Sequence, residues 1–329
     1  MMAKSKDLSG IDLVKWIMAF AVIAIHAPQY LWPENRSWPF ILDWFIRLAV
    51  PFFFAASGYL VERQLETIDD PSLRRSMLLH RALKVIKIWA CWSLLYLPLT
   101  IWGTGIADSE DAISDISSFM QDLLLSGHVE YSQPLWFLYS MAAVLLIWAF
   151  CDKLVMGIPF GLFAILAAML HCGFFDKSEV LQKIAIWILG GGLPVFGGAL
   201  LRKLLFRRCI QSISMFQIVI MLLIASILVK WQAWPYWTLL GGIGLLLLGL
   251  LLSRIINNNL LALRQQSMWI YYLHMWIIAI FMIVRFHIDI SLNKWIIYVC
   301  VCVVTWLASY GISRIVQYPR LSFLKFLIK

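Results

Sequence analysis

The chain has 329 residues, of which 62% are hydrophobic and only 14% are charged, and its mean hydropathy is +0.83. Soluble domains contain about 45–50% apolar and about 25% charged residues, so this composition excludes an ordinary soluble enzyme. The net charge of +9 would suggest a nucleic-acid partner in a soluble protein, but in a membrane protein basic residues concentrate in cytoplasmic loops, and no nucleic acid is expected here.

Apolar stretches of about twenty residues, each long enough to cross roughly 30 Å of hydrocarbon, recur along almost the whole chain. They predict an all-α integral membrane protein, a bundle of about ten transmembrane helices. Most Lys and Arg residues fall on one side of this layout, which places both termini in the cytoplasm. Too little chain is left for a separate soluble domain, so residues 1–329 are expected to form a single membrane-embedded domain. The expected spans lie near 10–32, 40–60, 85–103, 134–151, 154–175, 184–201, 212–230, 236–253, 268–284 and 295–314.

The first expected span carries three ionisable residues, Asp12, Lys15 and His26. Charged groups inside a span cost about 2.5–3.5 kcal/mol each, so they ordinarily face a bundle interior or an aqueous cavity. At 3.6 residues per turn the three share one stripe, with His26 roughly 16 Å beyond Lys15 along the axis. Because Lys binds phosphate and a neutral His accepts a proton near pH 7, the stripe suits a long phosphorylated donor. An ion pair at a helix end and an inter-helix hydrogen bond would explain the same residues without a ligand.

The second expected span contains Asp43 and Arg47, whose i,i+4 spacing predicts an ion pair on one helix face. The run Pro51–Tyr59 follows directly. Within it, Ser57 and Gly58 permit close approach of a neighbouring backbone or of a ligand. Tight helix packing is sufficient to explain this run.

Three segments between the spans have distinctive compositions. Residues 73–84 and the cluster Arg202–Arg208 mix basic and apolar residues. The first of these suits an interfacial helix, although contact of positive-inside loops with anionic membrane lipids explains both equally well. Residues 103–133 carry acidic side chains without Lys or Arg, and are expected to form an outer loop with some ordered structure.

The ninth expected span places Tyr271 and His274 three residues apart, and therefore on one helix face. They can supply a second polar wall, while an aromatic belt at the membrane interface accounts for Tyr271 equally well. The six cysteines form no C-x-x-C pair and no cluster with metal-ligand spacing. Neither a disulfide framework nor a metal site is expected.

Four motifs in chain order resemble the bacterial membrane acyltransferase 3 family. In that family the first span carries an Asp, a basic residue and, after ten residues, a His. A Phe-Phe…Ser-Gly-aromatic run, a Leu-Trp-Phe segment and a late Ile-Tyr-x-x-His follow. The matching residues are Ile11–Lys15 with His26, Pro51–Tyr59, Leu135–Leu138 and Ile270–His274. Together they cover nearly the whole chain.

The resemblance implies a multi-pass O-acyltransferase of the bacterial inner membrane. It would transfer an acyl group, most simply acetyl from cytoplasmic acetyl-CoA, to a hydroxyl of a cell-envelope or extracellular polysaccharide or of a lipid-linked sugar. In this interpretation His26 is the general base or transient acyl carrier, Asp12 fixes nearby charge and orientation, and Lys15 meets the donor phosphates. The candidates for substrate or oxyanion contacts are Ser57, Trp136, Tyr271 and His274.

The basic residue of the first motif departs from the family, in which it is commonly Arg. Lys15 keeps the charge but not the forked geometry of a guanidinium. A donor pose that requires a bidentate contact would therefore differ in this chain. The alternative function is a transporter, a flippase or a small-substrate-binding membrane domain that uses the same intramembrane charges.

Overall fold

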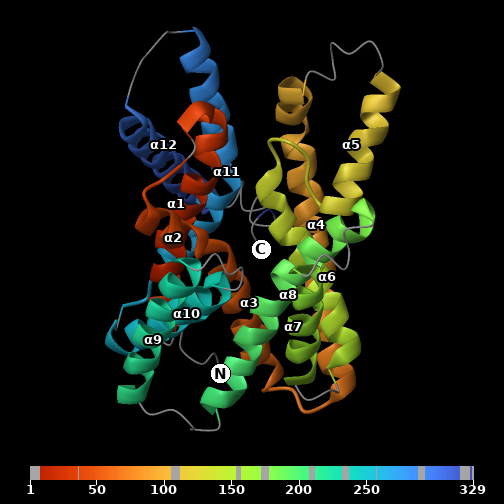
Figure 1. Ribbon diagram of the computed structural model, residues 1–329, viewed down its shortest axis with the longest axis vertical. Helices are drawn as coiled ribbons and strands as arrows, with labels where there is room; N and C mark the ends of the chain where they lie inside the picture. The colour runs from red at the N-terminus through yellow and green to blue at the C-terminus, as the bar shows by residue number, and fades with distance from the viewer. Residues whose placement is uncertain are drawn as a thin grey trace. The chain divides into compact units, whose positions relative to one another are not determined.

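The computed structural model describes residues 8–35, 37–104, 112–152, 157–171, 178–206, 212–231, 237–256, 258–287, 293–318 and 327 (Figure 1). These residues are helical almost throughout and contain no β-strand. Within them, eight helices are long and apolar enough to cross a membrane, and the apolar helices Ile158–Leu170 and Met215–Lys230 are shorter. Every expected span coincides with one of these helices. The chain is therefore an all-α, multi-pass membrane protein, while the count of ten spans and the side of the termini stay predictions.

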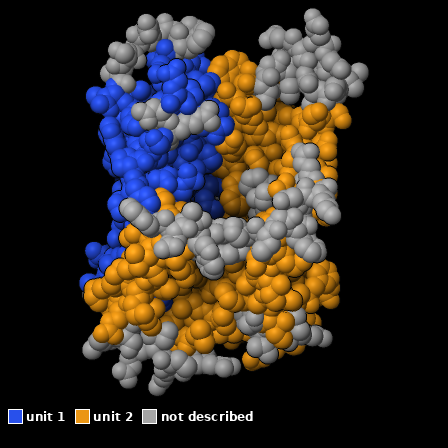
Figure 2. Space-filling model, viewed as in Figure 1, with its two compact units in different colours: residues 1–50, 245–329 blue, residues 51–244 orange. Residues whose placement is uncertain are grey.

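The described residues divide into two compact units, coloured separately in Figure 2. Unit 1 comprises residues 1–50 and 245–329, and unit 2 comprises residues 51–244. Unit 1 thus joins the two ends of the chain, so contacts of very long sequence separation build it. The expectation of a single domain stays a prediction.

Unit 1 is built around α1 (Ser9–Leu31), α11 (Leu261–His287) and α12 (Lys294–Ile315). The α1 helix packs against α11, and α11 packs against α12. The short α2 (Phe40–Arg47) and the second half of α10 (Trp237–Ile255) complete the unit. At the N-terminal end of α1, the backbone N–H of Gly10 donates to Ser253 Oγ of α10 at 2.9 Å, and Ser9 Oγ donates to the carbonyl of Asn258 at 2.6 Å. These bonds fix the start of α1 against the α10–α11 connection.

In unit 2, α6 packs against α4 and α8, and α8 also packs against α5 and α7. The helices of the unit are α3 (Ala49–Leu65), α4 (Pro71–Thr104), α5 (Ala112–Ser126), α6 (Trp136–Cys151), α7 (Gly157–His171), α8 (Glu179–Phe206) and α9 (Ser212–Trp231), with the first part of α10. The α5 helix lies within residues 103–133, which confirms ordered structure in that segment.

Two elements differ from the sequence prediction. The expected second span is divided into α2 and α3 at Leu48. Pro51 lies in the first turn of α3, where backbone N–H groups have no acceptor within the helix, so the N–H that proline lacks costs no hydrogen bond. The expected interfacial helix 73–84 is not separate, because α4 runs unbroken for 34 residues. At 1.5 Å per residue this helix is roughly 51 Å long, well beyond a hydrocarbon core of roughly 30 Å.

Candidate functional site

The polar stripe of α1 faces a second polar stripe on α11. Three side-chain contacts join the two helices, from Asp12 to Arg264, from Trp16 to Gln266 and from His26 to His274. Residue numbers rise together along both helices, so α1 and α11 run parallel. Of the two residues expected to supply a second polar wall, His274 of α11 lies beside His26 of α1.

At the N-terminal end of this interface, Asp12 and Arg264 form a bidentate ion pair. Arg264 Nε donates to Asp12 Oδ1 at 2.9 Å and Nη2 donates to Oδ2 at 2.8 Å. The Asp12 side chain is 4% exposed and that of Arg264 is 36% exposed. The partner of Asp12 is therefore a residue 252 positions away rather than Lys15 on its own helix.

Lys15 lies one turn further along α1 and is partly buried. Its ammonium makes no ion pair with any residue that the structure describes. Asp12, Lys15 and Arg264 together carry one net positive charge, since one carboxylate faces two cations. A buried or half-buried cation without a carboxylate of its own favours binding of an anionic group, and a Lys is a common phosphate ligand.

Further along the interface, two histidines meet. The rings of His26 and His274 have centroids 5.4 Å apart and planes inclined by 35°. His274 is fully buried, and its Nδ1 lies 2.7 Å from the carbonyl oxygen of Tyr271. A carbonyl oxygen only accepts, so Nδ1 carries the proton and Nε2 presents a lone pair. The ring of Tyr271 lies 6.3 Å from that of His274.

Between the two ends, Gln266 holds three helices together. Its Oε1 accepts from Trp16 Nε1 of α1 at 3.2 Å and from Trp306 Nε1 of α12 at 3.3 Å. Neither Arg264 nor Gln266 was among the residues expected at the site. The spacing of Arg264, Ser267, Tyr271 and His274 places all four on one helix face, and this periodicity was the available signal for Arg264.

Ser57 and Trp136 belong to unit 2. Ser57 Oγ donates to the carbonyl of Phe53 in its own helix at 2.8 Å, and the ring of Trp136 lies 5.6 Å from that of Phe54. Gly58 is the residue that makes the predicted close approach, because a Cβ at this position would overlap the carbonyl oxygen of Val195 in α8. The Ser-Gly motif therefore serves helix packing in unit 2.

Several basic residues of unit 2 have acidic partners. Arg202 Nη2 lies 2.7 Å from Glu66 Oε2, and Arg74 Nε lies 2.8 Å from Asp152 Oδ2. Lys203 Nζ lies 3.4 Å from Glu62 Oε1. These pairs account structurally for the described part of the basic cluster Arg202–Arg208, whose residues 207 and 208 lie outside the described residues.

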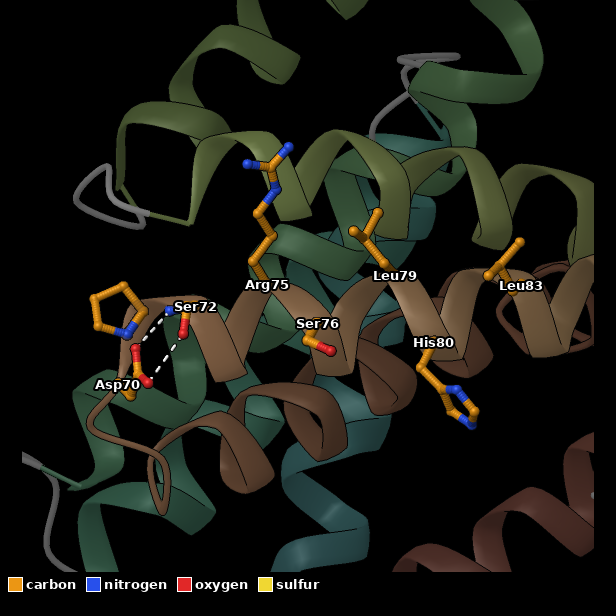
Figure 3. A pocket seen from close by; sticks show the side chains of 8 residues that line it. Asp70, Ser72, Arg75, Ser76, Leu79, His80 and Leu83 are labelled. Carbon is orange, nitrogen blue, oxygen red and sulfur yellow. Dashed lines mark hydrogen bonds between the residues drawn. The ribbon is translucent and has the colours of Figure 1, made fainter.

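An open groove of about 700 Å³ runs along the first half of α4 (Figure 3). Asp70 caps the helix there by accepting from Ser72, and Arg75 lies over the ring of Phe150 at 4.9 Å from its centroid. Leu79 and Leu83 continue the same side of the helix, and Leu83 is 55% exposed. Basic heads beside exposed apolar side chains are typical of a membrane–water boundary. The groove contains none of the expected site residues.

Replacing Asp12 with alanine is expected to destabilise the protein by roughly 2–3 kcal/mol. Removing one partner of a buried ion pair costs about 3–5 kcal/mol, and the partial exposure of Arg264 lowers that cost. The thermal unfolding midpoint in detergent measures the change.

Asp43→Ala is the matched control, because Asp43 pairs with Arg47 at 2.8 Å but the Arg47 side chain is 59% exposed. This exposed pair contributes about 0.2–1 kcal/mol. Equal losses in the two variants would contradict a structural role for the Asp12–Arg264 pair.

The geometry defines a polytopic membrane protein with a cationic end and a histidine pair on one helix–helix interface. The family model described as "Acyltransferase domain" matches residues 8–314, essentially the whole chain. The chain therefore belongs to the acyltransferase 3 family, and its resemblance to that family is confirmed.

Among characterised proteins, a segment is similar to the serine/alanine racemase of Enterococcus gallinarum, with 34% identity over 121 residues. The match covers 36% of this chain and 16% of that relative. No solved structure matches the chain significantly. Because so little of the racemase is matched, its activity gives no argument about this protein.

Proposed function

We propose that the chain transfers an acetyl group from cytoplasmic acetyl-CoA to a hydroxyl of a cell-envelope or extracellular polysaccharide, or of a lipid-linked sugar, in the inner membrane of a bacterium. Membership of the acyltransferase 3 family supports membrane acyl transfer. The observation that supports the proposed donor and catalytic residue is the stripe of α1. Lys15, which makes no ion pair among the described residues, lies at one end, and His26 lies beside His274 at the other.

The donor is proposed to lie along this stripe. Lys15 meets the phosphates of acetyl-CoA, and the thioester reaches toward His26, roughly 16 Å further along the helix. Asp12 lies roughly 21 Å from His26 along the same axis, too far to contact its ring. Its proposed role is confined to the donor end, where it neutralises and orients Arg264 so that Lys15 supplies the net charge.

His26 is proposed as the general base. It takes the proton of the acceptor hydroxyl while the hydroxyl oxygen attacks the thioester carbonyl carbon. The tetrahedral intermediate then collapses, the carbon–sulfur bond breaks, and the departing CoA thiolate takes the proton back from His26. Each turnover thus exchanges a thioester for an oxygen ester with no other reactant. Tyr271, whose ring lies 6.3 Å from that of His274, is the candidate on this interface for stabilising the oxyanion or contacting substrate.

Binding of acetyl-CoA to the purified full chain in detergent tests the donor site. Lys15→Gln is expected to weaken the Kd by about 10–100-fold, because a charge-assisted hydrogen bond contributes about 1.5–3 kcal/mol. Lys294→Gln makes the same change in charge at the start of α12, where Lys294 Nζ contacts the carbonyl of Ser37, and should leave the Kd unchanged.

Absence of acetyl-CoA binding by the folded wild-type protein would overturn the proposal. That result would support the alternative function, a transporter, flippase or small-substrate-binding domain in which the same intramembrane charges bind or move the substrate. Equal affinity of wild type and Lys15→Gln would overturn the role of Lys15 alone.

A further inference from the structure

The second histidine of the α1–α11 interface has a feature that the proposed reaction leaves unused. His274 is fully buried, and its single neutral-state proton is committed to the carbonyl of Tyr271, 2.7 Å from Nδ1. Nε2 of the same ring is buried and has no hydrogen-bond partner among the described residues. A buried acceptor without a donor costs about 1–3 kcal/mol, so its retention needs a reason.

The ring next to this acceptor is His26. Each imidazole nitrogen lies about 1 Å from its ring centre, so with centroids 5.4 Å apart a nitrogen of each ring turned toward the other would lie at roughly 3.4 Å from its counterpart, close to hydrogen-bond range. The terminal torsion of a histidine is broad, and a modest turn of the His26 ring suffices to direct one of its N–H groups at Nε2 of His274.

The need for such an acceptor arises during the reaction. When His26 takes the proton of the acceptor hydroxyl, the O–H bond breaks, an N–H bond forms, and the ring becomes a cation that carries two N–H groups. His26 is half-buried, and an imidazolium withdrawn from water is costly unless its N–H groups are hydrogen-bonded. In hydrolases with a Ser-His-Asp triad a carboxylate accepts from the second N–H, but Asp12 is roughly 21 Å away along α1 and is held by Arg264.

We propose that His274 is a positioning residue for His26, and that its Nε2 accepts the hydrogen bond of the second N–H when His26 is protonated. The bond orients the His26 ring toward the acceptor hydroxyl and stabilises the imidazolium until the proton passes to the CoA thiolate. The Tyr271 carbonyl keeps the proton of His274 on Nδ1, so Nε2 stays an acceptor throughout. This inference rests on the proposed role of His26 as general base.

Two amide substitutions separate the two nitrogens of His274. In His274→Gln the side-chain oxygen lies near the position of Nε2 and keeps an acceptor there, whereas His274→Asn keeps a donor for the Tyr271 carbonyl and lacks the acceptor. Acetyl-CoA cleavage by the full chain is expected to lose about 100-fold in kcat in His274→Asn and less than about 10-fold in His274→Gln. The KM for acetyl-CoA should stay unchanged in both, since Lys15 is remote.

A role in packing alone predicts a different order. His274→Phe preserves the ring volume and removes the acceptor, so packing alone would make it the most active variant, whereas the proposal expects it to match His274→Asn. If His274→Asn does not fold, the activity of His274→Phe tests the proposal in its place. Activity of an acceptor-free variant within 10-fold of wild type overturns the role of His274.

The outcome for His26 separates this inference from the proposed function. If wild type cleaves acetyl-CoA and His26→Ala does not, while folded His274→Asn remains fully active, only the inference about His274 fails. If wild type neither binds nor cleaves acetyl-CoA, the proposed function fails, and the role of His274 fails with it.

Discussion

Replacing His26 with alanine is expected to reduce acyl transfer by about 10²–10⁴-fold, the usual contribution of a general base. His26 is the ionisable group of α1 that lies beside a second buried imidazole, and the cationic end of the same stripe is more than two helical turns away. Transfer of radioactive acetyl from acetyl-CoA to the glycan and lipid fractions of membranes that contain the protein measures the loss. Protein abundance and thermal stability must match those of wild type.

His128→Asn is the matched histidine control for this experiment. His128 lies in unit 2 between α5 and α6, and its Nδ1 lies 3.1 Å from the carbonyl of Ser126, so it has a local structural contact. Acetyl transfer by this variant should stay within about 3-fold of wild type, because the change leaves the α1–α11 interface intact. Unchanged transfer in His26→Ala would rule out general-base catalysis by this residue.

Gly58→Ala is expected to cause, together with Gly198→Ala, the largest loss of stability of any methyl addition at the described glycines of unit 2. A Cβ on Gly58 of α3 would overlap the carbonyl of Val195 in α8, and a Cβ on Gly198 of α8 would overlap the carbonyl of Ala55 in α3. The two backbones are thus in direct contact at both glycines, and no flexible side chain can yield. Overpacking costs about 1–3 kcal/mol when side chains can adjust, so a larger loss is expected here.

Gly190→Ala in α8 is the control, since a Cβ at Gly190 has no atom within 4 Å. Alanine is favoured over glycine in a helix by about 0.8–1.0 kcal/mol in soluble peptides, so this variant should unfold at the same or a slightly higher temperature. Thermal unfolding in detergent compares the two. A midpoint for Gly58→Ala equal to that of Gly190→Ala would show that α3 and α8 do not depend on this contact.

Local sequence patterns predicted the parts of the site that lie on one helix. The spacing of Asp12, Lys15 and His26 identified the stripe that faces α11, and the i,i+4 spacing of Asp43 and Arg47 predicted their ion pair. Both depend only on the period of the α-helix. The apolar stretches located the helices for the same reason.

Partners that lie far apart in the chain were not predictable in this way. Arg264 appeared in the sequence as one of many basic residues near a span end, which positive-inside topology alone explains. Its pairing with Asp12 depends on α1 and α11 lying parallel across 252 positions of chain, for which no local pattern exists. The two tryptophans that donate to Gln266 were hidden for the same reason, because tryptophans in apolar segments are ordinarily assigned to the interface belt.

The Ser57–Gly58 motif is a sequence pattern with two explanations, close approach of a neighbouring backbone or of a ligand. Small residues permit close approach of any neighbour, and only the structure identifies that neighbour as the backbone of Val195. The length of α4 was misjudged for a related reason. The change from basic to apolar residues near position 84 is typical of a segment that enters the hydrocarbon, but a helix can continue unbroken from water into the membrane.

Parallel binding and cleavage measurements on purified wild type and His26→Ala test the central claim most directly. Acetyl-CoA is titrated into each protein in detergent, and release of the CoA thiol is followed in the same samples. The α1 stripe separates donor binding at Lys15 from proton transfer at His26, so His26→Ala should bind acetyl-CoA with the affinity of wild type and release thiol at least about 100-fold more slowly. Equal thiol release by the two proteins, or no binding of acetyl-CoA by either, would contradict it.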